Sequence, residues 1–258
     1  MTHDIVVIGC GTAGAAATLM ARKTNRTATI TIIQDESLPE YSRCGLPYTV
    51  NRKIPQMDDV IIHPNSFYTG KLVQANLQLS TRATNIDVKS KSISTEDAKG
   101  HADSLSYDAL VIATGARPST PPIDGLDASH VYRLHTLDDA RKLQANIRKG
   151  KKVAIIGAGL VGLETAEALH SLGLEVTVIE FLNQVLPAMI DKEMAELVQG
   201  RMEDEGVIVK LGTAAKSVLP KQVLVADRNT QAEEKISADL VVVATGVRAN
   251  TKLAAEAG

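Results

Sequence analysis

One pattern, an apolar run followed by G-x-G-x-x-G and a helix-forming segment, occurs twice in this sequence. The first copy reads D-I-V-V-I-G-C-G-T-A-G over residues 4–14, and the second reads K-V-A-I-I-G-A-G-L-V-G over residues 152–162. Another apolar run follows each helix, and parallel strands need a crossover of this kind between them. The helices and following strands expected in the two copies are Ala13 to Lys23, Ala28 to Ile33, Val161 to Leu172 and Glu175 to Ile179.

A second repeated pattern supports the same organisation. Tyr107 to Pro118 (Y-D-A-L-V-I-A-T-G-A-R-P) and Ala238 to Asn250 (A-D-L-V-V-V-A-T-G-V-R-A-N) each predict a buried strand that ends in Ala-Thr-Gly and then an arginine. Four signals in the order turn, ATG, turn, ATG are far more specific than any one of them alone. Together they predict an α/β fold with two Rossmann-like dinucleotide-binding domains.

The segments between these motifs are less regular. Residues 117–125 (R-P-S-T-P-P-I-D-G) are rich in proline and indicate a loop. Apolar residues recur at helical spacing over His135 to Lys149, which predicts a helix. Short alternating stretches at Ile86 to Val88 and Ser90 to Ser94 predict a β-meander, and the polar run from Glu96 to Ser106 indicates a turn or an exposed loop.

Each glycine of the repeated turn has a physical role. The first glycine allows a tight turn, the second lets the backbone approach a pyrophosphate, and the third lets helix and strand pack closely. The helix that follows offers unpaired N–H groups and a partial positive charge to the phosphates. The alternative, a Gly-rich turn that binds nothing, is disfavoured by the strand and helix on either side. The glycines are Gly9, Gly11 and Gly14 in the first copy and Gly157, Gly159 and Gly162 in the second.

The residue after the second strand differs between the copies. Glu180 ends V-T-V-I-E, where its carboxylate would accept hydrogen bonds from a ribose diol and repel a 2′-phosphate. The F-L-N that follows offers no Arg or Lys for such a phosphate, which favours NADH over NADPH. In the first copy, either Gln34 bonds the ribose without a charge, or Asp35 takes this role after a shift of one residue.

The composition excludes several classes of function. The net charge is −2 and Trp is absent, so the chain has neither the basic footprint nor the aromatic platform of a nucleic-acid-binding protein. Apolar runs such as Leu240 to Ala244 are far shorter than the ~20 residues of a membrane helix. Two cysteines cannot form a disulfide framework, so we expect a reducing, cytoplasmic setting, and we expect no metal.

Cys44 lies in Y-S-R-C-G-L-P-Y with no second cysteine within four or five residues. A lone redox cysteine must use another sulfur state, such as sulfenic acid, a persulfide or a mixed disulfide with a small thiol. Arg43 beside it and a helix that begins just after it would favour the thiolate. A small buried residue is the alternative interpretation. Cys10, inside the first turn, is interpreted as structural because a small residue is needed there.

These motifs together resemble those of the FAD- and NAD(P)-dependent pyridine nucleotide–disulfide oxidoreductases. The sequences GCGTAG, YSRCGLPY, VIATGARP, GAGLVGLETAEAL, VTVIE and VVVATGVRAN span residues 4–250 in the family order. Within the family, the chain resembles the single-cysteine branch of coenzyme A–disulfide reductase, NADH oxidase and NADH peroxidase. The resemblance implies an NAD(P)H-binding domain at 118–248, inserted into an FAD-binding domain at 1–117, and a return to the FAD domain beginning at 249–258.

The resemblance also implies a role for each motif. FAD would be held by the first turn with Thr114 and Gly115, and NADH by the second turn with Glu180. Electrons would pass from NADH through FAD to Cys44, which matches the redox cysteine of the family. Glu164 matches the glutamate near the flavin–nicotinamide junction, although it could simply complement the helix dipole. The other candidate cofactor-binding residues are Thr12, Ala13, Gln34, Asp35, Arg43, Leu160, Val161 and Gly246.

The chain departs from the family pattern in two ways. NADH oxidases and peroxidases carry a histidine in the first turn, where this sequence has Thr12 and Ala13. This difference favours reduction of a small disulfide or persulfide, such as coenzyme A disulfide, with oxygen or peroxide as the alternative acceptor. The sequence also ends at Gly258, just after the start of the family's return to the FAD domain and before its dimer-forming interface domain. We therefore expect an incomplete FAD domain, no interface domain, and a homodimer or a C-terminal partner in the full-length form.

A second class of function stays open at this point. The chain could be a nucleotide-binding module without turnover, either a remnant or a subunit of a split enzyme. Its NADH domain would then fold while its FAD site stays weak.

Overall fold

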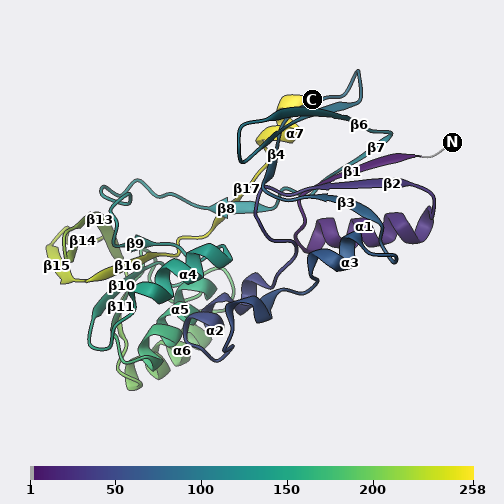
Figure 1. Ribbon diagram of the computed structural model, residues 1–258. Helices are drawn as coiled ribbons and strands as arrows, with labels where there is room; N and C mark the ends of the chain where they lie inside the picture. Colours follow the sequence, from purple (N-terminus) through teal and green to yellow (C-terminus); the bar gives the residue numbers. More distant parts are fainter. Residues whose placement is uncertain (1–2) are drawn as a thin grey trace. The chain divides into compact units, whose positions relative to one another are not determined.

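The structure is a computed structural model that describes residues 3–258, and it divides into two compact units (Figure 1). Unit 1 comprises the chain up to Ser42 together with Ile61–Arg117 and Ala249–Gly258. Unit 2 comprises Arg43–Val60 and Pro118–Arg248. The expected α/β fold, with one domain inserted into another, is confirmed. The division differs from the predicted one in a single place, because Arg43–Val60, expected in the first domain, packs within unit 2.

A four-stranded parallel sheet in the order β3-β2-β1-β7 lies at the centre of unit 1. β1 and β2 pair in parallel from Asp4↔Thr29 to Ile8↔Ile33, and helix α1 (Thr12–Thr24) is the crossover between them. The first helix therefore begins one residue before the predicted Ala13. The strands of this sheet are β1 (Asp4–Ile8), β2 (Thr29–Ile33), β3 (Ala75–Gln78) and β7 (Ala109–Ile112).

Both faces of this sheet are covered, as a parallel sheet requires. Ile30 and Ile32 point to the face of α1 and α3 (Asn65–Thr69), where they pack with Tyr68. Val6 and Ile8 point to the other face, where a meander and α7 (Lys252–Ala257) cover them. The meander strands are β4 (Thr81–Asp87), β5 (Ser92–Asp97) and β6 (Ala102–Ser106).

The polar run from Glu96 to Ser106 is a β-hairpin, so the prediction of a turn or loop over the whole run was wrong. Asp97 ends β5 and accepts hydrogen bonds from the backbone N–H groups of Lys99 and His101 over 2.8 and 2.9 Å. These bonds close a turn in which Gly100 has a φ of 82°. β6 is a largely exposed edge strand, so it needs no apolar side chains and gives no apolar signal in the sequence.

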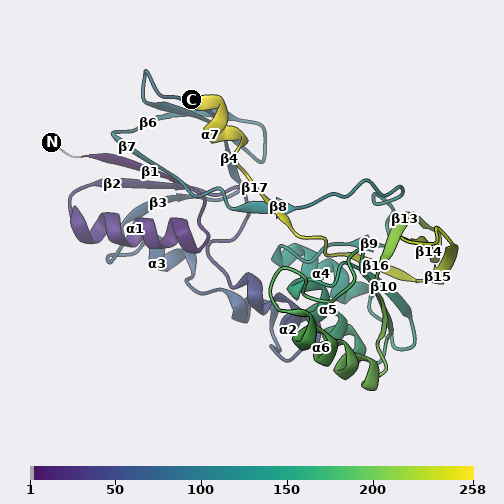
Figure 2. The same cartoon turned by 180° about the vertical axis from the view of Figure 1, so that it is seen from behind.

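Unit 2 contains a five-stranded, all-parallel sheet in the order β12-β11-β10-β16-β9. Helices α4 (Leu137–Asn146), α5 (Leu160–Ser171) and α6 (Lys192–Asp204) lie along one face, and an antiparallel meander covers the other (Figure 2). The sheet strands are β9 (Val131–Tyr132), β10 (Lys152–Ile156), β11 (Glu175–Ile179), β12 (Ile208–Lys210) and β16 (Leu240–Val243). The meander strands are β13 (Thr213–Leu219), β14 (Gln222–Asp227) and β15 (Glu233–Ser237).

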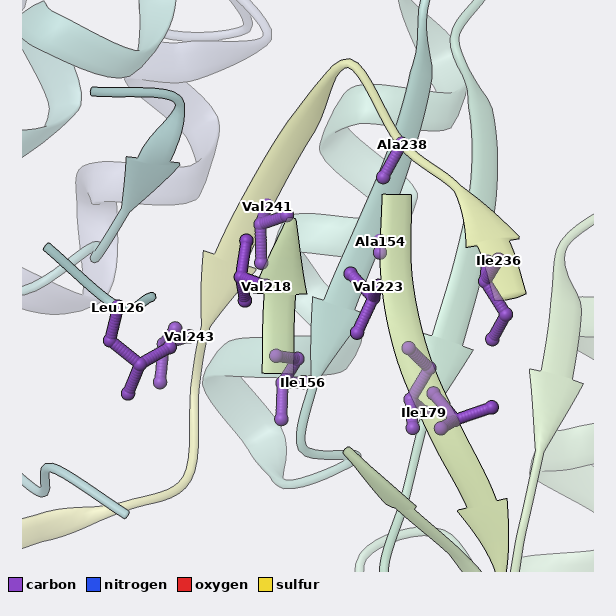
Figure 3. Close-up of a cluster of buried hydrophobic side chains, with 11 residues drawn as sticks. Leu126, Ala154, Ile156, Ile179, Val218, Val223, Ile236, Ala238, Val241 and Val243 are labelled. Atoms are coloured by element: carbon purple, nitrogen blue, oxygen red, sulfur yellow. The ribbon is translucent and has the colours of Figure 1, made fainter. Parts of the chain in front are cut away.

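The core between this sheet and its meander is made of aliphatic side chains (Figure 3). Ala154 and Ile156 of β10 alternate with residues that face the helices, as the period of two in a strand demands. Val218 and Val223, on neighbouring meander strands, pack on them with exposures of 5% and 0%. This packing holds the start of β13 beside the carboxyl ends of β10 and β11.

The predicted helix over His135 to Lys149 is shorter in the structure. Thr136 is the N-cap of α4, and its hydroxyl accepts a hydrogen bond from the backbone N–H of Asp139 over 3.1 Å. The Asp139 carboxylate accepts a hydrogen bond from the Thr136 N–H over 2.9 Å, which completes a capping box. His135 therefore lies outside the helix, and α4 ends at Asn146, before the predicted Lys149.

The remaining short elements join the larger ones. The excursion Arg43–Val60 consists of the 3₁₀ turns η1 (Arg43–Gly45) and η2 (Met57–Val60) with helix α2 (Leu46–Val50) between them. β8 (Ala116–Pro118) and β17 (Val247–Ala249) are the segments through which the chain passes from one unit to the other and back.

Candidate functional site

The two Gly turns have the same backbone geometry. Gly9 has a φ of 102° and Gly157 a φ of 109°, a region that favours glycine. The N–H group of each donates to the carbonyl at the end of the following strand over 2.8 Å. A side chain at Gly9 would collide with the carbonyl oxygen of Ala113, and one at Gly157 with that of Ala244. Glycine is therefore required at both positions by conformation and by space.

The third glycine of each turn permits close packing of helix on turn. A Cβ atom at Gly14 would overlap the carbonyl oxygen of Gly9, and one at Gly162 would overlap that of Gly157. Both glycines lie in the first turn of their helices, α1 and α5. The helix N-termini are thus held directly against the turns.

Within residues 3–258, no side chain caps the N-terminus of α1 or α5, whose N-cap residues are Gly11 and Gly159. Thr136 and Asp191, in contrast, cap α4 and α6 through hydrogen bonds of 3.1 and 3.0 Å. A methyl group at Gly11 or Gly159 would find no described atom within 4 Å. Free N–H groups, the helix dipole and open space together fit the pyrophosphate of a dinucleotide at each turn.

Glu180 and Gln34 occupy matching places in the two copies. The Glu180 Oε2 atom accepts a hydrogen bond from the N–H of Ala158 over 2.6 Å, and the Gln34 Oε1 atom accepts one from the N–H of Cys10 over 2.9 Å. Both side chains are buried, with exposures of 8% and 6%. The other oxygen of Glu180 accepts a hydrogen bond from the N–H of Leu182 over 2.8 Å. Both residues therefore brace the turn, and they differ in charge.

A cavity of about 590 Å³ lies beside the first turn, and Asp35 lines it whereas Gln34 does not. The Asp35 carboxylate is 56% exposed and lies 3.8 Å from the guanidinium of Arg82. Of the two alternatives for a ribose partner in unit 1, Asp35 is thus the one whose carboxylate borders the cavity. Thr12 and Ala13 follow the turn at the exposed start of α1.

Asn250 ties the first Ala-Thr-Gly loop to the C-terminal segment of unit 1. The Thr114 hydroxyl donates to the carbonyl oxygen of Asn250 over 2.8 Å, and the Asn250 side-chain amide donates to the carbonyl oxygen of Thr114 over 2.9 Å. The backbone N–H of Asn250 donates to the carbonyl oxygen of Gly115 over 2.9 Å. Thr114 and Asn250 line the cavity of unit 1, and the Arg117 guanidinium donates to the Asn250 side chain over 3.1 Å.

A second cavity, of about 720 Å³, lies beside the Gly157 turn. Of the described residues that line it, Glu180 and Lys216 are the charged ones. Lys216 lies where the pairing of β13 with β14 shifts register, and such a bulge re-aims a side chain. Gly246, with a φ of 93°, also lines this cavity. The sequence carries no local signal for Lys216, because the bulge is set by pairing with β14.

Arg228 lies against Phe181, the residue after Glu180. Its guanidinium carbon is 4.0 Å from the centroid of the Phe181 ring, and its Nη1 donates to the Phe181 carbonyl oxygen over 2.9 Å. No basic residue follows Glu180 directly in the sequence, where Phe181 and Leu182 come next. The structure supplies one from the turn after β14, a segment far along the chain.

Cys44 is exposed, whereas Cys10 is buried. Burial raises the pKa of the Cys10 thiol, which keeps that sulfur protonated. Cys44 lies in η1, and the guanidinium of the neighbouring Arg43 donates to the carbonyl oxygen of His135 over 2.5 Å. The interpretation of Cys44 as a small buried residue was therefore wrong.

The excursion that carries Cys44 is fastened to two helices of unit 2. The Gln144 side chain on α4 donates to the carbonyl oxygen of Thr49 over 2.9 Å. Arg141, also on α4, forms an ion pair with Asp58 at 2.7 Å. On α5, Glu167 forms an ion pair with Lys53 at 2.9 Å, which completes the attachment.

Glu164 lies on α5, one turn before Glu167, and it borders a third cavity of about 760 Å³. Tyr48 and Lys53 of the excursion line the same cavity. Burial raises the pKa of Glu164. The helix that carries Glu164 and the excursion that carries Cys44 therefore pack together in unit 2. Leu160 borders this third cavity, and Val161 follows it on the exposed start of α5.

A buried polar cluster behind the first turn was not predicted. The Glu40 carboxylate accepts a hydrogen bond from the Tyr68 hydroxyl over 3.2 Å and lies 3.0 Å from Nδ1 of His63. Glu40 is 6% exposed and Tyr68 is fully buried. The Tyr68 hydroxyl also contacts the Cys10 thiol, and burial raises the pKa of Tyr68. A lone acid in a polar loop gives no sequence signal of such burial.

The part of the chain that the structure describes has neither a metal-binding cluster nor a membrane-spanning helix. Among residues 3–258, no group of His, Cys, Asp and Glu side chains is arranged to hold a metal ion. In the same part of the chain, no helix is both long enough and apolar enough to cross a membrane.

Comparison with known proteins gives consistent matches. Residues 3–258 match the family described as pyridine nucleotide-disulphide oxidoreductase. An NADH oxidase of Methanocaldococcus jannaschii is 38% identical over 98% of this chain and 56% of its own length. A NAD-dependent persulfide reductase from A. fulgidus has a TM-score of 0.90 at 36% identity, over 99% of this chain and 48% of that one. CoADR-RHD from Bacillus anthracis has a TM-score of 0.93 at 25% identity, over 100% and 46%. The chain thus spans about half the length of these relatives.

Proposed function

Because this chain belongs to the pyridine nucleotide–disulphide oxidoreductase family, we propose that it carries electrons from NADH through FAD to Cys44, which reduces a small disulfide or persulfide. The observation that carries the sulfur chemistry is the contrast between the two cysteines. Cys44 is exposed and Cys10 is buried, so Cys44 is the thiol that a small substrate can reach. The named relatives support this reading, because one is a persulfide reductase.

We assign the FAD site to unit 1. The backbone N–H groups after Gly11 would bind the pyrophosphate of FAD, and Asp35 would bind its ribose. The loop that contains Thr114 would lie beside them. When bound, FAD supplies a two-electron carrier between a pyridine nucleotide and a thiol. The three glycines of the turn and the uncapped helix α1 provide the space and the donors that such a group requires.

We assign the NADH site to unit 2. The N–H groups after Gly159 would bind the pyrophosphate, and Glu180 would accept hydrogen bonds from the ribose diol. Because two backbone N–H groups already hold the Glu180 carboxylate, its oxygens are oriented before the nucleotide arrives. Glu164 would lie on the side of α5 that faces the Cys44 excursion, as a polar group near the reacting end of the nucleotide.

The sulfur step can be written with its atoms balanced. The Cys44 thiolate attacks one sulfur of a small disulfide RSSR, forms a mixed disulfide and releases RS⁻, which takes a proton. Two electrons and a second proton then restore the Cys44 thiolate and release the other RSH. The sum is RSSR + NADH + H⁺ → 2 RSH + NAD⁺, and for a persulfide it is RSSH + NADH + H⁺ → RSH + H₂S + NAD⁺.

The Cys44→Ser variant tests this proposal. We expect loss of turnover with coenzyme A disulfide, measured as NADH oxidation, because the mixed disulfide cannot form. NADH should still bleach the visible flavin spectrum of this variant, and ferricyanide reduction should persist, because neither needs the thiol. Normal turnover of the disulfide by Cys44→Ser would contradict the mechanism. A colourless protein that binds NADH but no FAD would instead support the nucleotide-binding module without turnover.

A second acceptor has one observation in its favour, the name NADH oxidase carried by the Methanocaldococcus jannaschii relative. Against it, Thr12 and Ala13 stand where a histidine proton donor would be expected in the first turn. Oxygen consumption measured beside coenzyme A disulfide reduction separates the two acceptors. NADH oxidation that stays equally fast with oxygen alone would favour the oxidase.

A further inference from the structure

The Arg228–Phe181 contact lies at the edge of the nucleotide cavity of unit 2. Phe181 lines that cavity directly after Glu180, and Arg228 covers its ring with a centroid distance of 4.0 Å. An arginine stacked on an aromatic ring is held in one orientation while its outer N–H groups stay available. One of these groups, Nη1, is bonded to the Phe181 carbonyl oxygen at 2.9 Å.

The backbone explains how a residue from the β14–β15 turn reaches this place. The N–H of Arg228 donates to the carbonyl oxygen of Gly212 over 2.9 Å, and the N–H of Gly212 donates to that of Leu182 over 2.9 Å. Thr213 in turn donates its N–H to the carbonyl oxygen of Glu180 over 2.9 Å. Backbone hydrogen bonds therefore join the segment after β11 to the meander. These bonds fix the position of Arg228 relative to Glu180.

The charge of Arg228 is not neutralised by a neighbouring acid. No Asp or Glu among residues 3–258 forms an ion pair with it. The adjacent Asp227 is occupied by its own turn, because it accepts hydrogen bonds from the N–H groups of Asn229 and Thr230 over 2.9 and 2.8 Å. These hydrogen bonds lower the pKa of Asp227. The guanidinium thus keeps donors for an anion from solution.

A phosphate on the 2′-oxygen of the adenosine ribose is the anion that this position suits. The ribose hydroxyls are expected at Glu180, and a 2′-phosphate extends from them past the residue that follows the strand. That residue is Phe181, whose ring carries Arg228. Glu180 opposes such a phosphate by charge repulsion, whereas Arg228 would bind it through charge-assisted hydrogen bonds.

We propose that Arg228 is a specificity-determining residue that lets the pyridine-nucleotide site of unit 2 accept NADPH as well as NADH, by binding the 2′-phosphate. This inference rests on the proposed function, because it assumes a pyridine nucleotide in this cavity. Glu180 and Arg228 act in opposite directions on the same group, so their balance sets the ratio of the two affinities. The sequence next to Glu180 contains no basic residue, so the local pattern by itself favours NADH.

Direct binding of each nucleotide tests this assignment. We expect Arg228→Ala to weaken the binding of NADPH by about tenfold, because it removes a charge-assisted hydrogen bond at an open site. The affinity for NADH, which lacks the 2′-phosphate, should change by less than about twofold. The measurement is calorimetric titration of the purified protein with NADPH and with NADH, together with adenosine 2′,5′-bisphosphate against 5′-AMP as probes that lack nicotinamide. Arg228→Lys should restore part of the NADPH affinity.

Two further variants complete the design. Arg148→Ala is the matched control, because Arg148 is an exposed arginine of unit 2 that also bonds backbone carbonyls, those of Ala145 and Ile147, and does not line the cavity. It should leave both affinities unchanged. Glu180→Gln should raise the ratio of NADPH to NADH affinity, and adding Arg228→Ala should remove that gain.

The outcomes separate this inference from the proposed function. Equal weakening of both nucleotides by Arg228→Ala, or no effect on either, would overturn the role of Arg228. The same holds if the wild-type protein binds NADH but not NADPH. Binding of neither nucleotide by the wild-type protein would overturn the proposed function itself. If Arg228→Ala fails to fold, judged by its circular dichroism, the Arg228→Lys and Glu180→Gln ratios decide the question.

Discussion

The turn at Gly9 and the turn at Gly157 share their positive φ, their uncapped helix and a side-chain acceptor bonded to the N–H of the turn. They differ in that acceptor, which is the neutral amide of Gln34 in unit 1 and the carboxylate of Glu180 in unit 2. The comparison teaches that bracing the turn requires an acceptor and not a charge. The charge is therefore free to differ between the copies, and we propose that it is the property that discriminates between nucleotides.

The surroundings of the two turns differ as well. Behind the first turn lies the cluster of Glu40, Tyr68 and His63, in which Glu40 is 6% exposed and hydrogen-bonded to the buried Tyr68 hydroxyl. Beside the second turn, the meander contributes the basic residues Lys216 and Arg228. Charged residues line the cavities of both units, among them Asp35 and Arg82 in unit 1 and Glu180 and Lys216 in unit 2, so the difference between the two turns lies in the Glu40 cluster of unit 1.

The largest expected effects come from the first glycine of each turn. We expect Gly9→Ala and Gly157→Ala each to destabilise the protein by about 2–4 kcal/mol, because a positive φ and a collision with a backbone carbonyl act together. Gly9→Ala should abolish flavin binding and leave NADH binding, and Gly157→Ala should do the reverse. Denaturant unfolding, flavin absorbance and NADH titration measure these effects.

Gly100→Ala and Gly150→Ala are matched controls for these two variants. Both glycines have a positive φ, 82° and 79°, but an added Cβ would meet no described atom within 4 Å. Each of these variants should lower the free energy of unfolding by about 1–2 kcal/mol and should still bind both FAD and NADH. If Gly9→Ala removed NADH binding instead of flavin binding, the assignment of cofactors to units would be wrong.

A smaller effect is expected from Glu40, which has no counterpart at the second turn. Glu40→Ala should destabilise the protein by about 2–3 kcal/mol, because it leaves the buried Tyr68 hydroxyl without its acceptor and removes the partner of His63. Glu40→Gln keeps an acceptor and should cost less. Equal costs for the two variants, measured by urea unfolding, would show that the hydrogen bond to Tyr68 contributes little.

The acceptor itself can be exchanged between the copies. We expect Gln34→Glu to cost about 1–2 kcal/mol, because it buries a charge and replaces the amide that faces the Leu38 carbonyl oxygen at 3.4 Å. Glu180→Gln should cost a similar amount, because an amide cannot accept from the N–H groups of both Ala158 and Leu182. Thermal unfolding measures the stability of both variants. If either substitution left the stability unchanged, the local hydrogen bonds would not determine which acceptor occupies the position.

The smallest effect concerns Glu164, on the helix that follows the second turn. Burial raises the pKa of Glu164, so the unfolded chain releases this proton at lower pH than the folded chain does. Stability from this group is therefore present at acid pH and is lost as pH rises through the pKa of the folded form. The stability of Glu164→Gln relative to the wild type should therefore rise, by up to about 0.5 kcal/mol, as pH rises through the pKa of Glu164 in the folded form, and the gain should persist above that pKa.

Glu167→Gln, one turn further along α5, serves as the control for Glu164. It breaks the ion pair with Lys53 at 2.9 Å and should slightly lower stability at neutral pH. Unfolding measured between pH 4 and pH 8 compares the two variants. If the stability advantage of Glu164→Gln over the wild type grew as pH fell, this result would contradict the raised pKa of Glu164.

Some features of the fold follow from short stretches of sequence. Helix α5 begins at Leu160, one residue before the predicted start, and β11 spans Glu175–Ile179 as predicted. These elements are set by local rules, namely a glycine-specific φ, the apolar period of a strand and the helix that follows a Gly turn. α4 begins at Leu137 and not at the predicted His135, because Thr136 and Asp139 form a capping box that sets the start of the helix.

The sequence by itself determined the two turns, the strands beside them and the residue types that a dinucleotide needs, because these depend on neighbours within one strand–turn–helix unit. The tertiary structure alone decided that the Cys44 excursion packs in unit 2, that Asp35 rather than Gln34 borders the first cavity, and that Arg228 stacks on Phe181. Each of these rests on contacts between segments far apart in the chain. No local pattern encodes such contacts, because they arise only when the strands pair and the meander packs on the sheet.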